Sequence, residues 1–297
     1  MLDRNMLFWY TSRMKTGFVT LFGRSNVGKS TLLNRLVGTK IAITSPKPQT
    51  TRHQLQGVVH ASEGQIVFVD TPGLFTSARN ALTKYLNQAA QSALKDVDVI
   101  VHVVDPTRAI GPEDKKNSAL LREIKKPKIL VINKMDVYKA PYVAAFEALA
   151  GEYDEVVKLS AQTGQHTSSL LQAIFQRLPE GEPSYAAGQW TNMDNAFWFA
   201  ELIREKLFLR LNDELPYSLT VRVDELDRRP DGTLYVRARI LTSHERYKGM
   251  IIGKGGRGIR EIGQSARKEI EGVIGGKAFL ELTVEVDPHW TEEFNIS

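Results

Sequence analysis

The sequence has no cysteine among its 297 residues, which excludes disulfide bonds and cysteine-ligated metal centres. It also lacks an apolar run of the roughly 18 residues that a membrane-spanning helix requires. Residues 1–15 are too short and too mixed in character to form a signal peptide, so they are interpreted as an N-terminal extension. These absences favour a cytoplasmic protein in a reducing compartment.

Acidic residues are scarce in one stretch of the second half. Residues 237–268 contain nine Lys or Arg but only two acidic residues, Glu245 and Glu261, while the whole chain carries a net charge of +5. A local basic patch is typical of a surface that binds a polyanion. A solvated charged face is the alternative interpretation, and contact with anionic lipid at the periphery of the cell membrane is another.

The first half alternates short apolar runs with helix-length segments, which predicts a doubly wound α/β domain with a mostly parallel sheet over residues 16–180. Helices are expected over 81–94 and 112–124. The expected strands are 18–22, 66–69, 99–104, 129–132 and 156–159.

The order of elements changes after a segment rich in proline and glycine, so residues 181–193 are predicted to be a linker. A compact α+β domain is expected over 194–288, followed by a tail over 289–297. Its order is a long helix (194–212), two strands joined at Pro230-Asp231-Gly232, two helices and a final strand. The two strands are expected over 218–224 and 233–241, and the last over 278–286.

A glycine-rich segment matches the phosphate-binding pattern G-x-x-x-x-G-K-[ST] at Gly23-Arg24-Ser25-Asn26-Val27-Gly28-Lys29-Ser30. It follows an expected strand and opens a helical stretch that starts at Thr31. The backbone N–H groups of such a loop face phosphates, and the helix dipole adds to the attraction. We expect Lys29 to contact the β- and γ-phosphates and Ser30 to bind Mg²⁺.

Two further segments are expected to complete the phosphate and metal site. Asp70-Thr71-Pro72-Gly73 follows an expected strand, so Asp70 is predicted to hold Mg²⁺ through a bound water or through another ligand of the ion, and Gly73 to donate its N–H to the γ-phosphate. Thr51, preferred over Thr50, is expected to bind Mg²⁺ while the γ-phosphate is present. Taken alone, each segment could be a simple turn.

The base is predicted to be guanine. Asn133-Lys134-Met135-Asp136 follows an expected strand, and the Asp136 carboxylate can accept from N1–H and the 2-amino group of guanine. Adenine lacks both donors, so it would leave a buried acceptor unpaired. Ser160-Ala161 follows the next expected strand, and a backbone N–H there suits the guanine oxygen.

The second domain contains a G-x-x-G loop between two expected helices, Gly253-Lys254-Gly255-Gly256. In KH domains this loop clamps the backbone of about four nucleotides. Arg257 and Arg260 would add charge beside it, and Ile251 and Ile252 would line the groove for the bases. The alternative is that the isoleucines are core residues and the glycines only turn the chain.

These motifs resemble those of translation-factor-related GTPases over roughly residues 17–178, and the chain resembles the Era family of bacterial GTPases over nearly its whole length. Glu201–Leu207 and Asp213–Tyr217 carry the resemblance at the start of the second domain. It implies a Ras-like P-loop GTPase domain followed by an α+β type II KH domain. It also implies a monomer that binds GTP and GDP, the 16S ribosomal RNA near its 3′ end, and the 30S subunit during its assembly.

The resemblance also bears on hydrolysis. Leu74 stands where some GTPases have a water-orienting glutamine, so slow intrinsic hydrolysis is expected. In the potassium-activated GTPases that this family resembles, the asparagine at the Asn26 position helps to hold K⁺, although Asn26 could instead only shape the loop. Lys29, Asn26, Thr51 and Gly73 are therefore the expected catalytic set. Ser25 departs from the proline usual at its position, and little effect is expected.

Three other classes of function fit the sequence less well. An RNA-modification enzyme would need a second catalytic centre, and residues 185–297 show no nucleophile–base pair or metal-ligand cluster in sequence. A structural RNA-binding module with a degenerate nucleotide site conflicts with the intact Lys29, Ser30, Asp70 and Asp136. An ATPase conflicts with the segment that ends at Asp136.

Overall fold

The computed structural model describes residues 14–73 and 81–294, which divide into two compact units. Of the described residues, 14–42, 51–73 and 86–192 form the first unit. Residues 43–50, 81–85 and 193–294 form the second. The expected roles of Leu74 and most of the N-terminal extension therefore fall outside the described residues. No helix of the described residues is long and apolar enough to cross a membrane.

The first unit is built on a six-stranded sheet in the order β2-β3-β1-β4-β5-β6. All neighbouring strands are parallel except β2 and β3, which are antiparallel. The β3 and β4 strands are buried along their whole length, as expected for apolar strands covered on both faces. The strands are β1 Lys15–Phe22, β2 Leu55–Ala61, β3 Gly64–Asp70, β4 Val99–Val104, β5 Lys128–Ile132 and β6 Glu155–Lys158.

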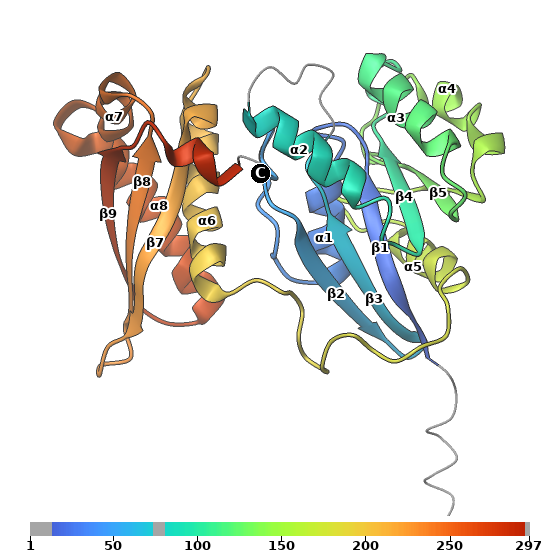
Figure 1. Ribbon diagram of the computed structural model, residues 1–297. Helices are drawn as coiled ribbons and strands as arrows, with labels where there is room; N and C mark the ends of the chain where they lie inside the picture. Colours follow the sequence, from blue (N-terminus) through green and yellow to red (C-terminus); the bar gives the residue numbers. More distant parts are fainter. Residues whose placement is uncertain (1–13, 74–80, 295–297) are drawn as a thin grey trace, which may run out of the picture. The chain divides into compact units, whose positions relative to one another are not determined.

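Helices cover both faces of this sheet, and Figure 1 shows α1 and α2 on opposite faces. The α3 helix begins at Pro112, a residue suited to the first helical position, and the Asp114 carboxylate accepts from Gly111 N–H at 2.9 Å. The helices are α1 Lys29–Val37, α2 Ala81–Ser92, α3 Pro112–Arg122, α4 Val143–Glu147 and α5 Thr167–Phe175.

The segment predicted to be a linker lies along the edge strand β2. Val58 N–H donates to Trp190 O at 2.9 Å, and Gly57 and Thr191 form an antiparallel bridge. The side chain of Gln65 accepts from the backbone N–H of Ser184 and Tyr185 at 2.8 and 3.0 Å. Helix α5 ends at Phe175, before the prolines and glycine of this stretch, and hydrogen bonds fix the following segment to the sheet.

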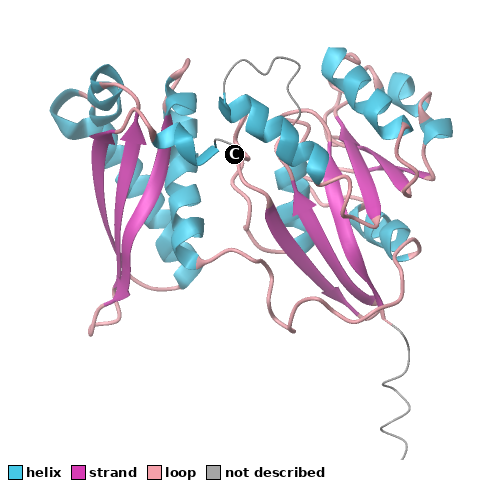
Figure 2. Cartoon of the chain, in the orientation of Figure 1, coloured by secondary structure: helices cyan, strands magenta, loops and turns pink. Residues whose placement is uncertain are grey.

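The second unit is an α+β domain whose long helix α6 (Asn195–Arg210) starts at the capping carboxylate of Asp194. Its sheet has the order β7-β8-β9, with β7 and β8 antiparallel and β8 and β9 parallel (Figure 2). Apolar side chains of α6, α8 and the sheet share one core. The remaining elements are β7 Leu219–Arg228, β8 Leu234–Thr242, α7 Glu245–Ile252, α8 Arg257–Ile274 and β9 Ala278–Val286.

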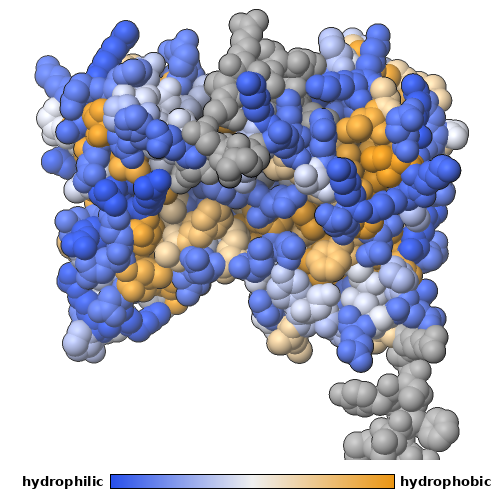
Figure 3. Space-filling view, in the orientation of Figure 1, coloured by the Kyte–Doolittle hydropathy of each residue, from blue (hydrophilic) through white to orange (hydrophobic). Residues whose placement is uncertain are grey.

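The predicted fold class of both domains is confirmed, with local differences. Strand β2 and helix α5 were not predicted, and β7 runs to Arg228 rather than ending at Asp224. The β7 strand continues through a register shift between Val223 and Glu225. Such a bulge interrupts the alternation of apolar and polar residues, so the alternation pattern predicted too early an end for the strand. On the face shown in Figure 3 the surface is mostly hydrophilic, with smaller hydrophobic areas over both units.

Candidate functional site

The predicted phosphate loop connects β1 to α1, at the carboxyl end of the sheet where ligands bind in open α/β folds. Gly23, Asn26 and Gly28 have φ of 147°, 64° and 100°, a conformation that glycine and asparagine tolerate best. A Cβ at Gly28 would lie 2.4 Å from Asn133 Nδ2. The glycine at this position is therefore required by both conformation and packing.

Lys29 is the buried cation of this loop. Its ammonium donates to the carbonyl oxygens of Gly23 and Arg24, both at 2.9 Å. Burial lowers its pKa to about 8, against the opposing influence of Asp70 and Glu113. The ammonium has lost its hydration and is held inside the loop by two carbonyl oxygens. It can therefore exchange these carbonyls for phosphate oxygens.

Three oxygen-bearing side chains meet at the end of β3. Ser30 Oγ donates to Asp70 Oδ2 at 2.8 Å and lies 3.0 Å from Thr51 Oγ1. Thr51 Oγ1 also lies 3.4 Å from Asp70 Oδ2. Thr50, by contrast, donates to Lys47 O at 2.7 Å within its own loop. The cluster is thus formed by Ser30, Thr51 and Asp70.

Asp70 is fully buried, and its second carboxylate oxygen, Oδ1, has no hydrogen-bond partner among the described residues. Burial raises the pKa of Asp70, against the lowering influence of Lys29 and Ser30. A buried, unpartnered carboxylate oxygen beside two hydroxyl groups matches the hard oxygen ligands that Mg²⁺ prefers.

The Asp70–Gly73 segment packs closely on the phosphate loop. Thr71 Oγ1 donates to Leu21 O at 3.2 Å. A Cβ at Gly73 would lie 2.7 Å from Ser25 N, so a larger residue would force the two loops apart. Pro72, between them, is buried.

Asn133 links two loops of the site through both ends of its amide. Its Nδ2 donates to Val27 O at 2.8 Å, and its Oδ1 accepts from Ala161 N–H at 2.9 Å. The side chain is buried, so its amide forms these hydrogen bonds with protein groups rather than with solvent. Asn133 therefore holds the phosphate loop and the loop after β6 in register.

Lys134 forms a second link. It has a φ of 61°, and its ammonium donates to Asn26 O at 3.0 Å and to Asp105 Oδ2 at 2.5 Å. Asp105 follows β4 and was not predicted as a site residue. Although burial raises the pKa of Asp105, hydrogen bonds from Lys134 and Thr107 lower it overall, which keeps the carboxylate charged opposite Lys134.

The predicted base-recognition carboxylate is oriented by a neighbour. Ser160 Oγ donates to Asp136 Oδ1 at 2.6 Å and accepts from Thr163 N–H at 3.1 Å. This hydrogen bond holds one of the two carboxylate oxygens in place. Sequence reasoning assigned Ser160 to the site but not this contact between side chains.

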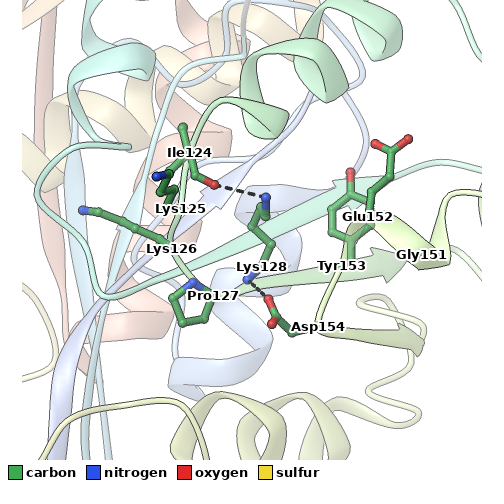
Figure 4. A pocket seen from close by; sticks show the side chains of 9 residues that line it. All are labelled: Ile124, Lys125, Lys126, Pro127, Lys128, Gly151, Glu152, Tyr153 and Asp154. Atoms are coloured by element: carbon green, nitrogen blue, oxygen red, sulfur yellow. Dashed lines mark hydrogen bonds between the residues drawn. The ribbon is translucent and has the colours of Figure 1, made fainter.

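A cleft of about 430 Å³ lies at the opposite, amino end of β5 and β6, and Figure 4 shows its lining. Lys126 donates to Val97 O at 2.7 Å, and Lys128 donates to Leu121 O and Ile124 O at 3.1 Å. These ammonium groups satisfy carbonyls at the ends of helices α2 and α3 and the segments that follow them. The two lysine side chains that line the cleft therefore have a structural role.

In the second unit, the predicted G-x-x-G loop separates α7 from α8. Gly253, Gly255 and Gly256 have φ of 71°, 60° and 73°. A Cβ at Gly258, two residues beyond the loop, would lie 2.4 Å from Ile251 O. These four glycines thus allow a tight crossing between the two helices, and Gly258 was not identified from the sequence.

The side chains around this loop fall into two groups. Ile251 is fully buried in the core, and Ile252 packs against that core from a partly exposed position. Lys254, Arg257 and Arg260 make no ion pair among the described residues, whereas Arg237 and Arg239 of the basic segment pair with Glu225 and Asp224. Positive charge is therefore available at the loop.

A groove of about 420 Å³ extends from the loop between α8 and β9. Its lining combines apolar side chains with arginine and glutamine, and only Gly256 and Arg260 were predicted. The residues that line it are Gly256, Ile259, Arg260, Gly263, Gln264, Arg267, Phe279, Leu280 and Leu282. A long, mixed groove beside a basic loop suits a single-stranded nucleic acid.

Known proteins match both units. Residues 18–134 match the family described as 50S ribosome-binding GTPase, and residues 214–291 match the KH domain. The chain is 44% identical over 283 residues to the GTPase Era of Carboxydothermus hydrogenoformans, covering 93% of this chain and 94% of the relative. It is 43% identical over 285 residues to the GTPase Era of Deinococcus deserti, covering 94% and 92%.

Two solved structures are similar over almost the whole chain. A crystal structure of Era in complex with MgGDPNP and nucleotides 1506–1542 of 16S ribosomal RNA superimposes with a TM-score of 0.88 at 36% identity. It covers 95% of this chain and 97% of that one. A single-residue variant of Aquifex aeolicus Era bound to GDP and AlF4⁻ gives the same values.

Proposed function

This chain is a GTPase of the Era family, and we propose that it couples GTP binding and hydrolysis to the binding of 16S ribosomal RNA near its 3′ end during assembly of the 30S subunit. The similar Era protein is seen with MgGDPNP and nucleotides 1506–1542 of that RNA. The observation that carries the proposal is the presence, in one chain, of an assembled guanine-nucleotide site and a basic G-x-x-G loop with its groove.

Guanine selection rests on the carboxylate of Asp136. Its Oδ1 is fixed by Ser160, so the carboxylate has one orientation in which to accept from a base. Because guanine offers two neighbouring donors and adenine none, a fixed acceptor discriminates strongly between them. Asn133 and Lys134 act as positioning residues, since their side chains hold the loops around the nucleotide rather than facing it.

Mg²⁺ is the metal that fits this site. Ser30, Thr51 and Asp70 bring two hydroxyl groups and a buried carboxylate together, and Mg²⁺ favours such ligands together with phosphate oxygens. When bound, the ion neutralises charge on the phosphates during transfer of the γ-phosphoryl group. Thr51 would engage only in the GTP state, which makes its loop the nucleotide-dependent element.

K⁺ is proposed as a second cofactor at Asn26. The backbone there is left-handed, and Asn26 O already accepts from Lys134, so the amide side chain projects from a firmly held turn. A cation held beside the phosphates would offset the charge that develops in the transition state. It would thereby compensate for the leucine at position 74.

The potassium proposal is tested by comparing GTP hydrolysis in K⁺ and Na⁺ at equal ionic strength. We expect faster turnover in K⁺, and no difference between the two salts in the variant Asn26→Gly. Glycine tolerates the left-handed backbone, so this variant removes the side chain without straining the loop. Equal rates of the unchanged protein in both salts would rule K⁺ activation out.

RNA binding is assigned to the G-x-x-G loop and its groove. Lys254, Arg257 and Arg260 supply charge that no carboxylate among the described residues neutralises, and the loop glycines permit close approach of a sugar–phosphate backbone. The groove between α8 and β9 then offers apolar and hydrogen-bonding side chains to the bases.

The coupling is tested by measuring GTP hydrolysis in K⁺ buffer with and without an RNA copy of the 3′ end of 16S ribosomal RNA. We expect stimulation by the RNA. The variant Lys254→Asp/Gly255→Asp should lose RNA binding and stimulation while retaining GTP binding. Lys268→Asp/Gly272→Asp is the matched control, because it makes the same change at exposed positions of α8 outside the groove. Equal losses in both variants would contradict the assignment.

The protein is further proposed to act as a monomer in the cytoplasm. Peripheral contact with the cell membrane through the basic segment is a separate hypothesis, supported only by its charge. Co-sedimentation with anionic vesicles, compared between the unchanged protein and the Lys254→Asp/Gly255→Asp variant, would test it, and absence of binding would reject it.

A further inference from the structure

Three side chains form a stacked cluster on the sheet face of the second unit. Tyr235 of β8 and Phe279 of β9 are register partners, and their rings stack with centroids 5.8 Å apart and planes 14° apart. The guanidinium of Arg229 lies over both rings, 4.6 Å from the Tyr235 centroid and 5.2 Å from that of Phe279. We name these three residues the aromatic cluster.

The cluster is held firmly by its surroundings. Tyr235 donates through its hydroxyl to Glu281 Oε2 at 2.7 Å. The backbone of Arg229 closes the β7–β8 turn through hydrogen bonds with Thr233 and Gly232 at 2.9 Å. Arg229 makes no ion pair with the carboxylates that the structure describes, so its charge is directed to the rings. Such a rigid support would lower the entropy lost when a ligand stacks on it.

One ring of the cluster remains half exposed. Phe279 has 48% of its surface accessible, and β9 is an edge strand, with β8 as its only neighbour in the sheet of the described residues. Tyr235 covers the side of Phe279 that faces β8. The exposed fraction of Phe279 therefore leaves ring surface that a ligand can contact.

Phe279 also belongs to the proposed RNA groove. It lines that groove together with Gly256, Arg260 and Arg267. The groove thus extends from the G-x-x-G loop to Phe279, the one member of the aromatic cluster among its lining residues. Lys277, exposed two residues before Phe279 in the sequence, adds positive charge at this end.

We propose that Phe279 is a stacking platform for one nucleobase of single-stranded RNA, next to the nucleotides clamped in the groove, with Tyr235 and Arg229 holding its ring. The inference rests on the proposed RNA-binding function and extends that binding site by one base. Aromatic side chains commonly bind unpaired bases in this way, because every base offers a flat face. Continuity with the groove favours RNA over a protein segment as the occupant.

The experiment measures affinity for RNA copies of nucleotides 1506–1542 of 16S ribosomal RNA and for copies shortened stepwise from each end. We expect Phe279→Ala to weaken binding of the full-length copy by roughly 5- to 150-fold, the range for loss of one base–aromatic stack. The effect should vanish once shortening removes one particular nucleotide. Phe279→Tyr, which keeps the ring, should bind like the unchanged protein, and so should Val273→Ala, an exposed apolar control on α8 outside the groove lining.

A spectroscopic readout separates stacking from a structural effect. With 2-aminopurine at the nucleotide identified by shortening, binding should quench its fluorescence, and Phe279→Ala should restore the emission at saturating protein. Thermal unfolding of each variant checks that the fold is intact.

Failure of this inference is distinguishable from failure of the proposed function. If Lys254→Asp/Gly255→Asp still binds RNA, the assignment of the groove is wrong. If that variant loses RNA but Phe279→Ala does not, or loses affinity equally for every RNA length, the stacking platform is refuted. If Phe279→Ala loses binding to a protein partner while its RNA affinity is unchanged, the stacking platform is likewise refuted.

Discussion

The hydroxyl of Ser160 donates a 2.6 Å hydrogen bond to Oδ1 of Asp136, the carboxylate proposed to recognise guanine. The two residues come from loops that follow different strands, β5 and β6. Their contact joins base recognition to the loop after β6, so removing it should alter specificity as well as affinity.

We predict that Ser160→Ala weakens GDP binding by about tenfold, since a hydrogen bond to a charged group contributes roughly 1.5–3 kcal/mol. The ratio of GDP to inosine diphosphate affinity should also fall, because inosine lacks the 2-amino group that a well-oriented Asp136 accepts from. Thr163→Ala alters the same loop without touching Asp136 and should leave the ratio unchanged. Titration calorimetry with both nucleotides measures it; an unchanged ratio in Ser160→Ala would contradict the orienting role.

Asn133 is predicted to stabilise the first unit before any nucleotide binds. Asn133→Ala removes the bonds to Val27 O and Ala161 N and leaves two buried groups unpaired, at about 1–3 kcal/mol each. Asn133→Asp keeps the acceptor for Ala161 but places a buried carboxylate oxygen against Val27 O, so it should lose at least as much. Urea unfolding of the nucleotide-free protein compares the two. Equal stability of all three proteins would show that Asn133 acts only on the ligand.

Thr51 is predicted to matter for GTP but not for GDP. Thr51→Val preserves shape and removes the hydroxyl that lies 3.0 Å from Ser30 Oγ. Affinity for a non-hydrolysable GTP analogue should fall, and should no longer increase with Mg²⁺ to the same extent, while GDP affinity stays near its original value. Ser30→Ala is the comparison, because it should weaken both nucleotides. Equal loss for GTP analogue and GDP in Thr51→Val would argue against a state-dependent ligand.

Acid should destabilise the first unit through His102. This side chain is fully buried, and its Nδ1 shares a hydrogen bond of 2.6 Å with the hydroxyl of Tyr153. Its Nε2 has no hydrogen-bond partner among the described residues. Burial lowers its pKa to about 4, with a smaller contribution from Lys29. In the unfolded chain it would take up a proton near its ordinary pKa of about 6.5. The unfolded state therefore binds more protons between about pH 4 and 6.5, and stability falls as pH is lowered through this window.

The slope due to His102 should approach about 1.4 kcal/mol per pH unit. His102→Gln cannot be protonated, so the difference in unfolding free energy between the unchanged protein and this variant should change with pH only below about 6.5. Denaturant unfolding at several pH values measures this difference. A difference that stays constant as the pH is lowered from neutral through this window would show that His102 takes up its proton equally in the folded and unfolded states.

The sequence was sufficient to predict that the candidate nucleotide-site residues converge, because parallel strands place their following loops at one edge of the sheet. Lys29, Asp70 and Asp136 each follow a strand within a few residues or open the adjoining helix, so local motifs also encode their spatial convergence. The order of elements in the second domain was predictable for a similar reason, since the alternation of β7 and β8 and the turn at Gly232 are local signals.

Contacts between distant residues could not be predicted in the same way. Asp105 follows a strand like the other site residues but carries no motif, and its partner Lys134 is 29 residues away. Likewise, the pattern around the G-x-x-G loop could not tell that Ile251 belongs to the core. Phe279 reads as an ordinary strand residue until the register with Tyr235 is known.

The segment along β2 protects that strand. An edge strand presents unpaired backbone groups that can recruit strands of other molecules, and here Trp190 O and the bridge at Thr191 occupy part of that edge. The stretch that looks most dispensable in the sequence thus acts as a cover against aggregation. Proteolytic cleavage around Gly188, or shortening of this stretch during engineering, would expose the backbone groups of β2. The protein would then be expected to self-associate through this edge.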